Sequence, residues 1–155
     1  MAWAKQDSVT TTGESIDNTI ATTFVMGMSH VFATGGNKAP NVRFDATGGT
    51  AYACRYSANG GTDVTEVSQP DIKGIGPTAD DDFSIFYAVN ISTEEKLVIM
   101  FAVNRNSAGA GSFPYREETV GKYSQTSTQA AQIGLIDTGT GSYTTSSNLS
   151  SIGTD

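Results

Sequence analysis

Residues 83–103 read Phe-Ser-Ile-Phe-Tyr-Ala-Val-Asn-Ile, then Ser-Thr-Glu-Glu, then Lys-Leu-Val-Ile-Met-Phe-Ala-Val. Two runs rich in β-branched and aromatic residues flank a short polar link, which is typical of a β-hairpin. Both runs are nearly continuous in apolar residues and do not alternate cleanly. The pattern therefore places this hairpin in the middle of a sheet that is covered on both faces.

The composition of the whole chain indicates one folded domain made of strands. The chain has 155 residues, of which 37% are hydrophobic and 9% aromatic, and it contains 17 glycines. This length is sufficient to bury a core without covalent crosslinks, so we expect a single domain over residues 1–155. Leucine, a strong helix former, occurs only at Leu97, Leu135 and Leu149, whereas Val, Ile, Thr, Tyr and Phe are common.

The rest of the chain is divided into short apolar segments by glycine-rich turns. We expect a strand over residues 23–33 with Phe24, Met26, Met28 and residues 31–32 facing the core and Gly27 marking a bulge. The glycine pair at 48–49 predicts a second hairpin between residues 42–46 and 51–57. The charged residues of 115–123 favour an edge strand. Further strands are expected at 3–9, 64–69, 130–137 and 148–153, and residues 15–22 are expected to form an edge strand or an ordered loop.

This arrangement predicts an all-β fold with little or no helix. Roughly eight to ten short strands separated by regular turn signals are typical of an antiparallel β-sandwich or barrel. A hairpin-rich chain of this size fits a sandwich of the jelly-roll type, with an immunoglobulin-like sandwich as the alternative.

Charge and targeting signals narrow the function classes. The net charge is −7 and no basic cluster occurs, which argues against nucleic-acid binding and against an anionic membrane surface. No run approaches the length of a membrane span, and residues 1–7 lack the apolar core of a signal peptide. Cys54 is the only cysteine and is expected to be a small buried side chain. We therefore expect a soluble protein made in a reducing cytoplasm.

The residues that carry chemistry do not form a recognisable catalytic, cofactor or metal motif. His30 and Cys54 lie outside any nucleophile motif and supply too few ligands for zinc. Adjacent glutamates at 94–95 and 117–118 point to opposite faces of a strand or lie in a turn, which excludes a glycosidase pair. The acidic run 80–82 lacks the spacing of a calcium loop. We expect a protein that is not an enzyme and binds no cofactor or metal.

Aromatic residues beside loops are the more useful signal. Such side chains can stack on a sugar, dock a neighbouring protein or cap the ends of a sandwich. The residues selected as possible interface or ligand contacts are Trp3, Phe113, Pro114, Tyr115 and Tyr143.

Several segments, in the same order along nearly the whole chain, resemble a family of small structural proteins of tailed bacteriophages, especially marine ones. These segments are Met-Ala-Trp-Ala-Lys-Gln at 1–6, Tyr-Ala at 52–53 with Arg-Tyr-Ser at 55–57, Asn-Gly-Gly-Thr-Asp at 59–63, Glu-Glu-Lys-Leu at 94–97, Ala-Gly-Ala-Gly at 108–111, Val-Gly-Lys-Tyr at 120–123, and the closing residues 147–155. The resemblance implies a virion component and transfers no catalytic residue.

Together these observations lead to two expectations. The first is a capsid decoration or outer-shell protein, assembled in the host cytoplasm, that contacts copies of itself and other virion proteins by strand-edge pairing, swapped terminal segments or symmetric surfaces. The second is a tail-fibre or receptor-binding module that recognises a cell-surface glycan through its loop aromatics.

Overall fold

The computed structural model describes residues 2–10, 12–34, 36–76 and 80–155, and these residues form only strands and connections. No helix among them is long and apolar enough to cross a membrane. The strands are β1 (Ala4–Thr10), β2 (Ser15–Thr19), β3 (Phe24–Val31), β4 (Ala33–Thr34), β5 (Pro40–Phe44), β6 (Tyr52–Ala58), β7 (Val64–Gln69), β8 (Asp82–Val89), β9 (Lys96–Asn104), β10 (Tyr115–Tyr123), β11 (Gln132–Asp137), β12 (Ser142–Tyr143) and β13 (Asn148–Thr154).

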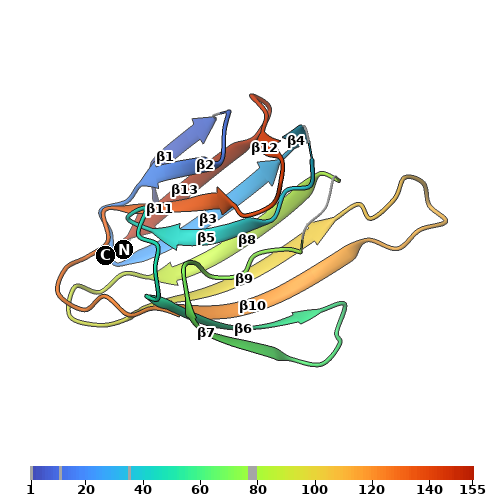
Figure 1. Ribbon diagram of the computed structural model, residues 1–155. Helices are drawn as coiled ribbons and strands as arrows, with labels where there is room; N and C mark the ends of the chain where they lie inside the picture. Colours follow the sequence, from blue (N-terminus) through green and yellow to red (C-terminus); the bar gives the residue numbers. More distant parts are fainter. Residues whose placement is uncertain (1, 11, 35, 77–79) are drawn as a thin grey trace.

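Eight strands form one large antiparallel sheet in the order β1-β13-β3-β8-β9-β10-β6-β7 (Figure 1). The expected hairpin is formed by β8 and β9, which pair in register from Asp82 opposite Asn104 to Val89 opposite Leu97. These two strands lie at the centre of the large sheet, as the sequence predicts. The first and last strands, β1 and β13, pair with each other within the chain, so both termini belong to the same sheet.

A smaller sheet in the order β2-β11-β5, which we call the cover sheet, lies over one face of the large sheet (Figure 1). The core fills the space between the two layers, and the all-β antiparallel sandwich predicted from the sequence is confirmed. Its largest fully buried apolar or aromatic side chains are Ile16, Phe44, Tyr52, Ile72, Ile75, Phe86, Met100, Ile133, Leu135 and Tyr143. The short strands β4 and β12 pair beside these layers.

Residues 42–46 and 51–57 do not form the expected hairpin. The first segment belongs to β5 in the cover sheet and the second to β6 in the large sheet, so the turn between them carries the chain from one layer to the other. The Tyr52 hydroxyl fixes this crossing, because it accepts a hydrogen bond from Phe44 N–H (2.9 Å) and donates one to Phe44 C=O (3.0 Å). A tyrosine side chain thus takes the place of a neighbouring strand along that part of β5.

The polar strand β10 is not an edge strand, contrary to expectation. It lies between β9 and β6, and the edges of the large sheet are β1 and β7. Its charges are tolerated there because most of them face solvent on the uncovered side of the sheet. Glu117, which faces inward and is 2% exposed, accepts a hydrogen bond from Gly76 N–H at 2.8 Å.

Phe24, Met26 and Met28 on β3 face away from the core, contrary to expectation, whereas Val31 lies in the core as expected. Phe24 and Met28 are exposed, whereas Val25 and Val31 are in the core. Gly27 is regularly paired and marks no bulge; the ring of Phe86 lies where its side chain would be. Since side chains alternate along a strand, the alignment of this glycine with Phe86 places Phe24, Met26 and Met28 together on the outer side.

Candidate interaction surface

The face of the large sheet that the cover sheet does not touch is built mainly from apolar side chains. Along β9 the burial alternates strictly, so Val98, Met100 and Ala102 enter the core while the residues between them are exposed. The sequence predicts a hairpin covered on both faces, but the described residues of this chain cover only one of them. We call the exposed large side chains of this side the outer apolar face: Phe24, Met28, Phe83, Tyr87, Leu97, Ile99, Phe101, Val103, Val120 and Ile152.

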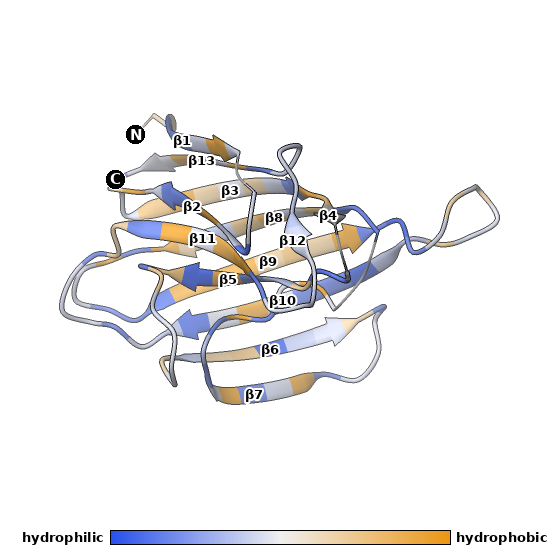
Figure 2. Cartoon of the chain, turned by 45° about the horizontal axis from the view of Figure 1, so that its top comes forward, coloured by the Kyte–Doolittle hydropathy of each residue, from blue (hydrophilic) through white to orange (hydrophobic). Residues whose placement is uncertain are grey.

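Strand pairing joins these side chains into one continuous surface. Met26, Tyr87 and Ile99 are consecutive cross-strand neighbours on β3, β8 and β9, and Val120 on β10 follows Ile99. In Figure 2 apolar colour lies along the central strands β8 and β9, as well as on β11 and β5 of the cover sheet. From the exposed fractions, the outer apolar face offers on the order of 1,000 Å², whereas one partner of a standard interface contributes about 800 Å². An isolated soluble protein rarely exposes a contiguous apolar patch of this size.

Charged residues on β6 and β10 border the outer apolar face, and each basic group has an acidic neighbour. Arg116 Nη1 lies 3.0 Å from Glu118 Oε1, and Lys122 Nζ lies 2.7 Å from Glu95 Oε2. Arg55 on β6 pairs more loosely with Asp63 at 3.9 Å. The border is therefore close to electrically neutral, although the whole chain carries a net charge of −7.

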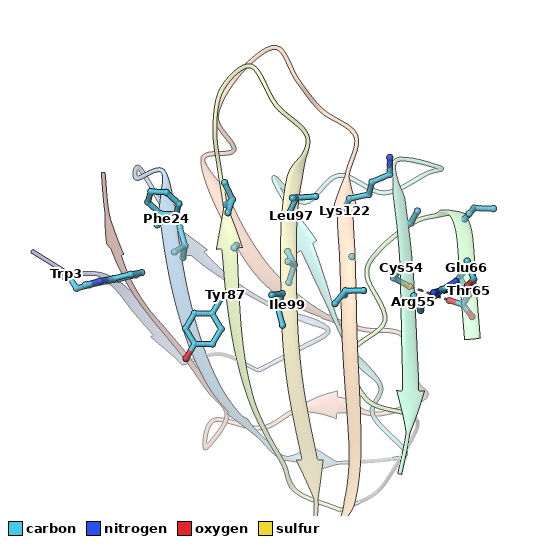
Figure 3. Close-up of a pocket in the computed structure, with 18 residues that line it drawn as sticks. Trp3, Phe24, Cys54, Arg55, Thr65, Glu66, Tyr87, Leu97, Ile99 and Lys122 are labelled. Atoms are coloured by element: carbon cyan, nitrogen blue, oxygen red, sulfur yellow. Dashed lines mark hydrogen bonds between the residues drawn. The ribbon is translucent and has the colours of Figure 1, made fainter. Parts of the chain in front are cut away.

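One end of the outer apolar face is hollowed into an open groove of about 680 Å³ (Figure 3). Trp3 lies on one side of the groove and Arg55, Thr65 and Glu66 lie on the other, with Tyr87, Leu97 and Ile99 between them. The lining is mostly apolar, so the groove suits an apolar or aromatic side chain of a partner better than a polar ligand.

Both edges of the large sheet carry an irregularity that hinders pairing with another strand. On β1 the register shifts between Lys5 and Asp7. On β7 it shifts at Ser68, which has a φ of 55°. Bulges of this kind twist an edge away from a second chain. The geometry therefore favours contacts through the face of the sheet over strand-edge pairing.

The aromatic residues selected from the sequence are not gathered in one place. Trp3 is 51% exposed and borders the groove. Phe113, at 68% exposure, and Pro114 lie in the long β9–β10 connection, which projects from the opposite end of the sandwich from the termini (Figure 1). Tyr115 is partly buried against the core and donates a long hydrogen bond to Glu117 (3.5 Å).

Tyr143 does not lie at the surface as expected, because it is 1% exposed and belongs to the core. The local sequence, rich in Gly, Ser and Thr, resembles a surface turn. This composition gives no sign that β12 pairs with β4 and that the Tyr143 side chain therefore points into the core.

No motif in the sequence singles out the outer apolar face. Residues 97–103 nevertheless indicate it, because apolar residues occupy both faces of this strand. Periodicity cannot show whether the second face is covered by the same chain or by another one.

The residues with possible catalytic chemistry lie apart. His30 is exposed on β3 beside Phe32, with ring centroids 4.3 Å apart, whereas Cys54 faces the core on β6. Between these strands lie β8, β9 and β10.

Within the described part of the chain, no group of three or more His, Cys, Asp or Glu residues could hold a metal ion. Asp80 pairs with Arg105 at 2.9 Å while Asp82 is buried, so the acidic run does not converge on one point.

Comparison of the chain with family models, with curated proteins and with solved structures gave no match. The function of this chain is therefore inferred from its fold and from the outer apolar face.

Proposed function

We propose that this chain is a structural protein of a tailed-phage virion, located in the outer shell as a capsid decoration protein, and that it acts by protein–protein adhesion. The observation that carries the proposal is the outer apolar face on a rigid two-layer sandwich. Its apolar centre and charged border follow the anatomy of a protein interface. The order of the segments that resemble small virion proteins agrees with this assignment.

The occupant of the outer apolar face is a second copy of the same chain. The area of the outer apolar face suits a stable dimer, in which the large sheets of two copies pack face to face about 10 Å apart. The paired charges on its border allow two copies to approach despite the overall negative charge. The irregular edges β1 and β7 leave the face as the available contact.

Sedimentation of the purified chain tests this proposal. We expect the wild type to sediment as a dimer or larger oligomer and the Ile99→Lys and Val120→Lys variants as monomers. An uncompensated ammonium in the interface costs several kcal/mol, so the dissociation constant should rise by more than about tenfold. Val64→Lys is the matched control, because Val64 is 42% exposed but lies opposite Tyr56, on the other side of the sheet from Ile99. A monomeric wild type at all concentrations, or equal loss of assembly in the control, contradicts the proposal.

The number of copies per virion distinguishes a capsid decoration protein from a tail protein. Densitometry of purified virions should give many copies per particle for a decoration protein. A receptor-binding module would instead be present in few copies, with a glycan bound at exposed aromatic residues. The observation that favours this second candidate is the position of Trp3 and Tyr87 on the open groove. Glycan-array binding that is lost in Trp3→Ala, together with a low copy number, would replace the first proposal with the second.

A further inference from the structure

A lysine and an aspartate are buried together where the connection between β4 and β5 meets the start of β8. Lys38 Nζ lies 3.3 Å from Asp82 Oδ2, and the two side chains are 0% and 2% exposed. Apart from this contact, the Lys38 amine and both Asp82 oxygens have no hydrogen-bond partner among the described residues. An ammonium group and a carboxylate each need several hydrogen bonds when they leave water. The ionic form of the pair is therefore poorly stabilised.

The neutral form of the Asp82 carboxyl suits this site better than the carboxylate. Burial, with Asp80 and Asp81 nearby, raises the pKa of Asp82 to about 7 in spite of Lys38. Transfer of one proton from Lys38 to Asp82 leaves an amine with a free lone pair beside a carboxylic acid. An amine and a carboxylic acid are the two reactants of amide condensation.

Two further polar groups are buried in this region without hydrogen-bond partners among the described residues: the Tyr143 hydroxyl and Asp137 Oδ2. Burial raises the pKa of Tyr143, and the charges of Asp137 and Asp82 raise it further. The other oxygen of Asp137 accepts a hydrogen bond from Ala39 N–H at 2.8 Å, directly after Lys38.

We propose that Lys38 and Asp82 form an intramolecular amide bond after folding. The neutral Nζ attacks Cγ of the protonated Asp82 carboxyl, a C–N bond forms and the C–OH bond breaks. The nitrogen loses one proton to the departing hydroxyl, which leaves as water, so atoms and charges balance without an oxidant or a co-reactant.

Such a crosslink would join the segment that leads into the cover sheet to a central strand of the large sheet. It would restrict the unfolded chain as a disulfide does. With Cys54 as its only cysteine, the chain has no internal disulfide. A covalent tie between its layers would suit a protein that must keep its shape on the outside of a particle.

The intact mass of the full-length protein, measured under denaturing conditions, tests the proposal. We expect the wild type to be lighter by one water molecule than its sequence requires, and Lys38→Ala to have the full mass of its own sequence. Trypsin should no longer cleave after Lys38, and fragmentation should identify a branched peptide that joins it to Asp82.

The wild-type measurement decides the question even where a variant fails to fold. A wild-type mass equal to that of the uncrosslinked sequence after prolonged incubation overturns the proposal. Loss of water that persists in Lys38→Ala also overturns it, because the dehydration then lies elsewhere in the chain.

Discussion

Gly27 on β3 lies opposite Phe86 on β8, and the Phe86 ring occupies the space that any side chain at residue 27 would need. Phe86 is 0% exposed, so its ring cannot move out to solvent. The absence of a side chain at Gly27 thus allows the Phe86 ring to enter the core. The same alignment turns Phe24, Met26 and Met28 to the outer face.

We therefore expect Gly27→Ala to destabilise the protein by about 1–3 kcal/mol, the usual cost of overpacking a core. Urea unfolding monitored by circular dichroism measures the change. Gly48→Ala is the control, since a Cβ at Gly48 would meet nothing within 4 Å. An unchanged midpoint for Gly27→Ala would show that the Phe86 ring has room to shift.

A second prediction concerns Lys96, which is buried at the start of β9. Its Nζ donates hydrogen bonds to the carbonyls of Ile91 (2.9 Å), Glu94 (2.8 Å) and Gln125 (2.8 Å). It thereby ties the turn of the central hairpin to the β10–β11 connection. Lys96→Met removes all three donors, and since each unsatisfied buried carbonyl costs about 1–3 kcal/mol, we expect a loss of at least about 2 kcal/mol.

Lys122 is the matched control for Lys96, because its ion pair with Glu95 at the same end of the sheet is exposed. Lys122→Met should change the free energy of unfolding by less than about 1 kcal/mol, as for other surface pairs. Equal effects of the two substitutions, measured by urea unfolding, would refute the role assigned to Lys96.

The sequence predicted the fold class and the central hairpin because both depend on local patterns. The β-branched and aromatic runs of 83–103 specify strands, and Ser-Thr-Glu-Glu specifies the turn between them. The sequence Asn59-Gly60 likewise predicts the turn between β6 and β7, and these residues have positive φ values of 52° and 73°.

The sequence could not predict how the strands are distributed between the layers, because that depends on distant contacts. The crossing between β5 and β6 is fixed by the Tyr52 side chain, and β10 lies inside the sheet because β9 and β6 pair with it from either side. The buried partners Lys38 and Asp82 are also far apart in sequence. Charged residues such as these look like surface residues until the fold brings them together.

A third prediction uses the buried thiol of Cys54, which is 5% exposed. Burial raises its pKa, so the reactive thiolate is scarce in the folded protein. If labelling requires global unfolding, a thiol reagent should react more than about 1,000-fold slower with the native protein than with the unfolded chain. Thr62→Cys in a Cys54→Ala background, exposed in the turn between β6 and β7, should label rapidly. Native labelling of Cys54 within tenfold of the unfolded rate would contradict its place in the core.

The last prediction concerns Glu117, whose carboxyl is buried while that of its neighbour Glu118 is exposed. Burial raises the pKa of Glu117 above its ordinary value of 4.5, although the Gly76 N–H works against this shift. The folded protein therefore binds a proton here more tightly than the unfolded chain does. Between 4.5 and the raised pKa the folded state holds more protons, so stability falls as pH rises through that window.

Glu117→Gln removes this titration while its amide oxygen can still accept the hydrogen bond from Gly76. Urea unfolding at a series of pH values from 4 to 8 should show a smaller loss of stability with rising pH in this variant than in the wild type. Part of the decline will remain, because burial also raises the pKa of Asp71 and, where it is not crosslinked, that of Asp82. Glu118→Gln should keep the wild-type profile, because that carboxylate is solvated and paired with Arg116. A Glu117→Gln profile parallel to the wild type would mean that Glu117 is ionised in both states and that its burial has no energetic consequence over this range.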